Sequence, residues 1–232
     1  MDHRNSMNQL WQKRWDKGDT TWHKEQVNPF LKEFFTSFTG EVAAKSILVP
    51  LCGKSVDLIW LHKKGMNVIG VELVKRAIEE FFDEHNMVYT VEESSVLPEC
   101  LVYRHEDRMT IYQCDFFKIT SELFGGPVDF LWDHGSLVAI EYESKLCYSK
   151  VIQSVFSSSG EGLVEVVGYD RTLHPGPPFS TVETDVVSFF SGKFSVEKLC
   201  EWKATQLPGY ASKIPGLAEA DYKVFYIQGM NR

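Results

Sequence analysis

The sequence of 232 residues predicts one α/β domain with a doubly wound, mostly parallel sheet of seven strands and an antiparallel pair at its C-terminal edge. Three observations favour this fold class. Short apolar runs alternate with helical periodicities, as expected when right-handed crossover helices join parallel strands. Two strand-like runs close the chain with little room for a crossover helix, which indicates an antiparallel pair. The length also suits a single core, which grows to about 250–300 residues.

The predicted strands are short apolar runs bounded by glycine, proline or charged residues, a pattern typical of buried strands. They cover 47–49, 68–72, 110–115, 128–133, 162–169, 194–202 and 222–228. The irregular, charged stretch 92–107 is expected to be a loop or an inserted hairpin.

The predicted helices show apolar residues three or four positions apart. Four of them lie among the strands, at 56–61, 77–82, 143–156 and 183–190. Two more helical patterns precede the first strand, one with Trp11 and Trp15 on a shared face and one across Phe30 to Phe38. We expect residues 1–40 to form a helical cover and residues 41–232 the α/β core of the single domain.

The composition narrows the class of protein. The formal net charge of −8 argues against nucleic acid and anionic membranes as partners, because both select basic surfaces. Five dispersed cysteines without a CxxC pair predict neither a disulfide framework nor a metal site, and Cys114 and Cys200 are expected to be small core residues. No apolar run suits a signal peptide or a spanning helix. We therefore expect a cytoplasmic protein, a monomer, whose partner is a small molecule.

The candidate site should lie just beyond the carboxyl ends of the strands, where ligands bind in open α/β sheets. The first strand leads into Pro50–Lys54, in which Gly53 lets the backbone approach a ligand, although an ordinary turn would explain it equally well. Glu72 ends the second strand 19 residues later, the spacing at which nucleoside-binding folds place a ribose hydroxyl acceptor. A helix-capping or solvent-exposed glutamate is the alternative.

Later strand ends add further candidates. Asp115 and Phe116 follow the third strand, where an acid can accept from an adenine amino group and an aromatic ring can face the base. The fourth strand ends in Asp133, which His134 follows, at the centre of the predicted rim. A histidine whose hydrogen bonds are satisfied within the protein is the alternative for His134. The stiff segment 174–179, with Pro178 and Phe179, is either a connector or a rigid wall for an acceptor.

Taken together, these motifs resemble the thiopurine S-methyltransferase family. The resemblance runs from about Trp11 to about Phe190, with the motifs in order and at compatible spacing. It is carried by Trp11–Trp15, Gly18–Gln26, Pro50–Lys54, Gly70–Glu72, Trp132–Ile140 and His174–Phe179.

The resemblance implies a Rossmann-like class I methyltransferase fold with S-adenosyl-L-methionine as cofactor and no metal. The segment from Trp11 to Trp22 would cover the cofactor as a lid, whereas an amphipathic core is the alternative for these tryptophans. The implied cofactor contacts are Trp11, Trp15, Leu51, Gly53, Glu72, Asp115, Phe116 and His134. Trp22, Pro178 and Phe179 would line the substrate site, and Asp133 and His134 would orient the reactants.

Two departures from the family pattern concern the part of the site that would bind the methyl acceptor. The family's Trp-Asp-Arg-Gly reads Trp132-Asp133-His134-Gly135, which replaces a permanent forked cation with a titratable ring. The segment 207–221 also differs from the vertebrate enzymes, whose substrate-side arginine we cannot place in it.

The predicted reaction is in-line methyl transfer to the sulfur of a small thiol, in which the protein aligns and desolvates the reactants. Three alternatives remain at this point. A nicotinamide-dependent oxidoreductase should carry a complete GxGxxG turn, which is absent. The others are a noncatalytic S-adenosylmethionine-binding module and a methyltransferase for small thiols, halides, thiocyanate or selenium species.

Overall fold

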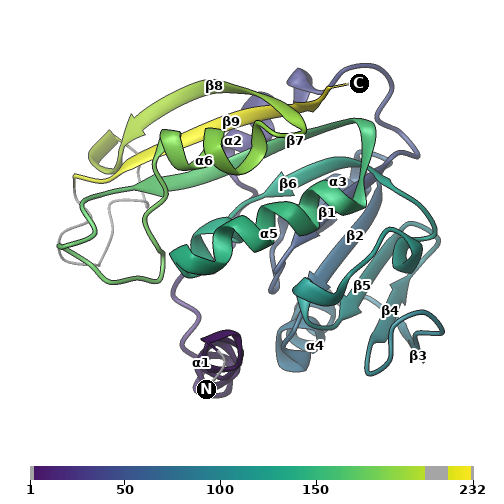
Figure 1. Ribbon diagram of the computed structural model, residues 1–232. Helices are drawn as coiled ribbons and strands as arrows, with labels where there is room; N and C mark the ends of the chain where they lie inside the picture. The colour runs from purple at the N-terminus through teal and green to yellow at the C-terminus, as the bar shows by residue number, and fades with distance from the viewer. Residues whose placement is uncertain (1–2, 207–218, 231–232) are drawn as a thin grey trace. The chain divides into compact units, whose positions relative to one another are not determined.

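The computed structural model describes residues 3–206 and 219–230 (Figure 1). The chain divides into two compact units. Unit 1 comprises Met1–Phe130, and unit 2 comprises Leu131–Arg232. The predicted single domain, with its division at residue 40, stays a prediction. Within the described residues, no helix is both long and apolar enough to cross a membrane.

Unit 1 contains helices and five hydrogen-bonded strands in the order β3-β4-β5-β2-β1. Strands β1, β2 and β5 run parallel, whereas β4 and β3 form an antiparallel hairpin at the edge. The elements are α1 His3–Asp16, α2 Pro29–Phe34, the 3₁₀ turn η1 Phe35–Ser37, β1 Ser46–Pro50, α3 Asp57–Lys63, β2 Asn67–Glu72, α4 Lys75–Glu84, β3 Thr90–Glu93, β4 Leu101–His105, β5 Met109–Gln113, η2 Phe116–Lys118 and η3 Glu122–Phe124.

Local sequence explains these elements. The apolar strands β1 and β2 are buried along nearly their whole length, as expected for parallel strands covered on both faces. Helix α4 buries Ala77, Ile78, Phe81 and Phe82, which recur at helical spacing. Helix α2 starts at Pro29 because the Asn28 side chain caps it and accepts from the amides of Phe30 and Leu31.

Unit 2 contains the end of β6 Val128–Asp133 and an antiparallel arrangement with the order β7-β9-β8. Its other elements are η4 Leu137–Ala139, α5 Tyr142–Val155, β7 Phe156–Gly168, α6 Glu183–Phe190, β8 Phe194–Lys203, η5 Ala204–Gln206 and β9 Asp221–Gly229. Helices α5 and α6 contact each other, and α6 also contacts β8 (Figure 1). The pairing of β8 with β9 confirms the predicted antiparallel C-terminal pair.

The structure corrects some details of the prediction. The described residues contain nine strands, so the expected count of seven is wrong. The two additional strands are β3 and β4, at the position of the predicted inserted hairpin, and β3 is exposed throughout, which explains its charged sequence. Strand β5 ends at Gln113, before Cys114 and Asp115. Cys114 is buried as expected, but Cys200 is only half-buried and is no core residue.

Candidate active site

Glu72 joins the ends of three strands in unit 1. Its carboxylate accepts hydrogen bonds from the Gly53 amide, 2.9 Å away beyond β1, and from the Val74 amide at 2.7 Å. Its backbone carbonyl accepts from the Cys114 amide, 3.0 Å away beyond β5. The side chain is only 6% exposed, and burial raises its pKa. Glu72 is therefore a fixed carboxylate whose remaining lone pairs suit vicinal hydroxyl groups.

The turn that contacts Glu72 has an unusual backbone. Leu51 and Gly53 both lie in the left-handed region, with φ of +43° and +52°. Such a conformation is costly for leucine, and strain of this kind is concentrated at functional sites. A Cβ atom at Gly53 would lie 3.3 Å from the Trp15 ring, so a glycine also fits the packing here.

The three N-terminal tryptophans form one cluster. The Trp22 ring contacts Trp11 and Trp15 edge to face, at centroid separations of 5.2 and 5.8 Å. Arg14 lies over the Trp22 ring at 4.3 Å and pairs with Asp19 at 2.9 Å. Trp15 is buried against Val74 and Ala77, as the core interpretation expects, whereas Trp11 and Trp22 are half-buried. The cluster packs against the Gly53 turn through Trp15.

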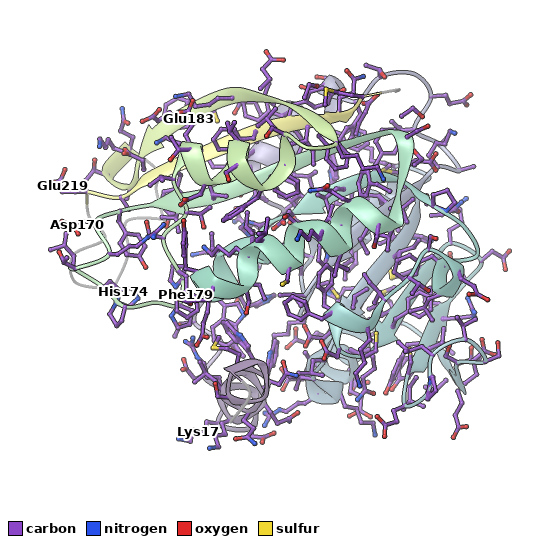
Figure 2. The ribbon with its side chains drawn as sticks, viewed as in Figure 1. Lys17, Asp170, His174, Phe179, Glu183 and Glu219 are labelled. Atoms are coloured by element: carbon purple, nitrogen blue, oxygen red, sulfur yellow. The ribbon has the colours of Figure 1, made fainter. Side chains whose placement is uncertain are left out.

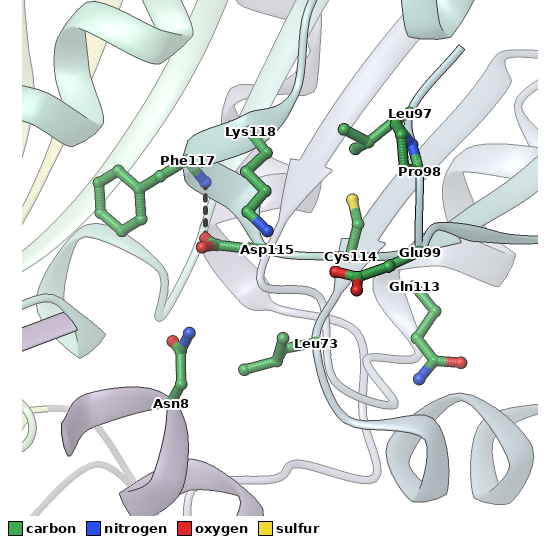
Figure 3. Close-up of a pocket in the computed structure, with 10 residues that line it drawn as sticks. All are labelled: Asn8, Leu73, Leu97, Pro98, Glu99, Gln113, Cys114, Asp115, Phe117 and Lys118. Carbon is green, nitrogen blue, oxygen red and sulfur yellow. Dashed lines mark hydrogen bonds between the residues drawn. The ribbon is translucent and has the colours of Figure 1, made fainter. Parts of the chain in front are cut away.

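A pocket of about 480 Å³ opens beyond the ends of β2 and β5 (Figure 3). Its lining includes Asn8 of α1, Leu73, Asp115 and Phe117. The Asp115 carboxylate accepts a 2.9 Å hydrogen bond from the Phe117 amide, which orients it (Figure 3). Phe116 is buried and is not among the lining residues, whereas Phe117 is. The remaining lining residues are Leu97, Pro98, Glu99, Gln113, Cys114 and Lys118.

Asp133 lies at the end of β6 in unit 2 and is fully buried. It accepts hydrogen bonds from the Tyr148 hydroxyl at 2.8 Å and from the Leu137 amide at 3.0 Å. Burial raises its pKa to about 6, against the opposing effect of these two donors. The carboxylate therefore ties the turn after β6 to helix α5.

His134 points to a different partner. Its Nδ1 atom lies 2.9 Å from Oε2 of Glu165, a buried residue in the middle of β7. The imidazole also stacks on Trp132, with centroids 5.7 Å apart and an interplanar angle of 17°. Neither Glu165 nor this pairing follows from any short sequence motif.

The proline-rich segment of unit 2 is anchored at Phe179. The Phe179 amide donates to the Val138 carbonyl at 2.6 Å, and the fully buried Lys145 donates to the carbonyls of Phe179 and Ser180 and to the Thr181 hydroxyl. Tyr169 donates to the Pro178 carbonyl. Figure 2 shows His174 and Phe179 at the same end of unit 2. Pro178 and Phe179 are thus half-buried and held in place.

A family model described as thiopurine S-methyltransferase matches residues 6–229. The chain belongs to the thiopurine S-methyltransferase family. It is 34% identical to a probable thiopurine S-methyltransferase of Danio rerio over 193 residues, 82% of each protein. It is also 34% identical to the thiopurine S-methyltransferase of Pseudomonas putida over 190 residues, 82% of this chain and 85% of that protein.

Solved structures show the same fold. The 1,6-didemethyltoxoflavin-N1-methyltransferase of Burkholderia thailandensis, with bound S-adenosylhomocysteine, aligns with a TM-score of 0.66 at 13% identity, over 99% of this chain and 90% of that one. The magnesium protoporphyrin IX methyltransferase of Synechocystis aligns with a TM-score of 0.63 at 11% identity, over 97% of both chains. These matches confirm the predicted Rossmann-like α/β methyltransferase fold.

Family membership and fold make the chain an S-adenosylmethionine-dependent methyltransferase. Within this family member, unit 1 brings Trp11, Trp15, Trp22, Gly53 and Glu72 into one network and places Asp115 at the adjacent pocket. In unit 2, Phe179 is hydrogen-bonded to η4. Asp133 is bound by the hydroxyl of Tyr148, whereas His134 pairs with the carboxylate of Glu165. The residues that sequence analysis missed are Leu73, Phe117, Tyr148, Lys145 and Glu165.

Proposed function

We propose that this methyltransferase transfers a methyl group to the sulfur of a small aromatic or heterocyclic thiol such as a thiopurine. The match of residues 6–229 to the thiopurine S-methyltransferase family is the observation that carries this proposal. The aromatic character of the Trp11–Trp22 segment and of the Phe179 segment also suits a flat, apolar acceptor.

The residues of unit 1 fit an adenosyl group. The buried Glu72 carboxylate is held by two backbone amides and suits the ribose hydroxyls, and its negative charge disfavours a 2′-phosphate. Asp115 suits the amino group of adenine, and the aromatic ring of Phe117 suits its face. We therefore assign the pocket and the Gly53 turn to cofactor binding, together with Leu51 and the tryptophan cover.

When bound, S-adenosylmethionine supplies a methyl group that is already electrophilic because it is attached to a sulfonium sulfur. The chain's own residues then have to exclude water and align the acceptor within about 3–3.5 Å of that carbon. We assign water exclusion to Trp11, Trp15 and Trp22, acceptor positioning to Trp22, Pro178 and Phe179, and support of the turn after β6 to Asp133.

The test is methyl transfer from labelled S-adenosylmethionine to a panel of a thiopurine, a thiophenol, an aliphatic thiol, iodide and thiocyanate, with a reaction lacking any acceptor as blank. Label on the thiopurine or the thiophenol supports the proposal. Label on iodide or thiocyanate alone would replace it with transfer to small anions, and no transfer to any acceptor would contradict it.

A further inference from the structure

Glu165 is an unusual residue for its place in the fold. Strand β7 is buried from Gly160 to Gly168, and Glu165 is only 4% exposed within it, opposite Val224 of β9. A buried carboxylate loses its hydration, and this cost is tolerated where a specific donor compensates it. The His134 ring supplies such a donor within unit 2, with Nδ1 lying 2.9 Å from Oε2 of Glu165.

The geometry fixes which ring nitrogen carries the proton. An ionised carboxylate only accepts hydrogen bonds, so Nδ1 of His134 is the N–H donor when Glu165 is charged. In the neutral ring the lone pair then lies on Nε2. The stacked Trp132 ring fixes the plane of the His134 imidazole. The His134 side chain is 25% exposed to solvent. Among the described residues of unit 2, the titratable groups that interact with this pair include Asp133, next to His134, and Tyr222, which interacts electrostatically with Glu165.

We propose that Glu165 is a positioning residue that holds His134 as the proton acceptor for thiols that are mostly protonated at neutral pH. This inference rests on the proposed S-methylation and extends its substrate class to aliphatic thiols, whose pKa lies near that of cysteine, about 8.5. Aromatic thiols ionise more readily and need no such acceptor.

The acceptor S–H proton moves to Nε2 of His134, while the sulfur electron pair forms the new bond to the methyl carbon. The bond between that carbon and the sulfonium sulfur breaks, and its electron pair stays on the departing thioether. The positive charge of the sulfonium is thereby replaced by that of the imidazolium, which the Glu165 carboxylate stabilises.

The first experiment reads the tautomer directly. Long-range ¹H–¹⁵N correlation spectra of the uniformly labelled protein distinguish pyridine-type from pyrrole-type ring nitrogens, and His134→Gln identifies the signal among the seven histidines. We expect a protonated Nδ1 and an unprotonated Nε2 in the wild type, and a mixture of tautomers in Glu165→Gln. A wild-type ring protonated only on Nε2 would overturn the proposal.

The second experiment separates a catalytic role from a structural one. In Glu165→Gln we expect kcat for an aliphatic thiol to fall about 10²-fold, and kcat for an ionised aromatic thiol to change less than about 3-fold. The matched control is Glu161→Gln, which removes a second buried carboxylate four residues earlier on β7 and should leave the ratio of the two rates unchanged. Thermal melts report whether both variants are folded.

The outcomes are distinguishable from those of the proposed function. An equal fractional loss of kcat for both kinds of thiol in Glu165→Gln would overturn the positioning role while leaving S-methylation intact. If the wild type methylates aromatic thiols but no aliphatic thiol, the extended substrate class is wrong. If it methylates no thiol, S-methylation itself fails, whereas the tautomer spectrum still reports on the Glu165–His134 pair.

Discussion

The hydroxyl of Tyr148 donates a 2.8 Å hydrogen bond to the carboxylate of Asp133, and both residues are fully buried. This contact ties the turn after β6 to helix α5. Since the Leu137 amide binds the other oxygen of the same carboxylate, Asp133 holds the turn that carries His134. Asp133 therefore stabilises the turn after β6 and does not itself need to contact the substrate.

Tyr148→Phe should lower the free energy of unfolding by about 1–3 kcal/mol, because it leaves a buried carboxylate oxygen without its donor. Urea denaturation at pH 7.5 measures the change. The matched control is Tyr142→Phe, which removes a hydroxyl that donates to Asp185 at 3.1 Å from a 42% exposed side chain, and which should cost less. Equal effects in both variants would show that burial of the Asp133 contact has no energetic weight.

Because of Lys145, the free energy of unfolding should rise with pH above pH 7. Burial lowers its pKa to about 7 from 10.5, with Asp185 partly opposing the shift. Between these values the unfolded chain holds a proton that the folded protein has lost, so the stability of the folded protein rises with pH across that window. The free energy of unfolding of the wild type relative to Lys145→Met should therefore increase from pH 7 to pH 10, by up to about 1.4 kcal/mol per pH unit. Parallel stability curves for the two proteins would contradict this.

Gly53→Ala should weaken binding of S-adenosylhomocysteine about 10-fold or more, because the new Cβ lies 3.3 Å from Trp15 at a φ of +52°. Gly40→Ala is the matched control: its φ is +75°, but no atom lies within 4 Å of the added carbon. Both variants place an alanine in the left-handed backbone region, but only Gly53→Ala brings the new carbon against Trp15. Only Gly53→Ala should therefore change the affinity for S-adenosylhomocysteine measured by calorimetry. An unchanged affinity in Gly53→Ala would remove the turn from the cofactor site.

Glu72→Gln should reduce affinity for S-adenosylhomocysteine by about 10–100-fold, since an amide group cannot accept from both Gly53 and Val74 and also bind ribose hydroxyls. Glu79→Gln, on the exposed side of α4, is the control and should bind as the wild type does. Affinity is measured by titration calorimetry after a thermal melt has shown that both variants are folded. Equal affinity in the two variants would be incompatible with the assigned role of Glu72.

The part of the site that sequence could predict lies at the ends of parallel strands. Glu72 and Gly53 are 19 residues apart, yet β1 and β2 are neighbouring parallel strands, so their ends meet and the 2.9 Å contact follows from topology. Asp115 lies just beyond β5, the next parallel strand, and lines the pocket, while its contact with the cofactor stays a prediction.

Other features depend on local geometry or distant packing. The 3₁₀ turn capped by Asp115 buries Phe116 and leaves Phe117 among the residues that line the pocket, a distinction that the sequence alone does not make. Glu165 lies within an otherwise apolar strand and meets His134 across 31 positions of sequence, a pairing that no periodicity encodes. Lys145 falls within an ordinary helical pattern, and its contacts with 179–181 arise only from packing. The monomeric state and the cytoplasmic location stay predictions.

The most direct test of the central claim is titration calorimetry of the folded wild-type chain with S-adenosylhomocysteine. We expect saturable binding of one molecule per chain, competed by S-adenosylmethionine and weakened in Glu72→Gln. Absence of saturable binding by either compound to protein shown to be folded would contradict it.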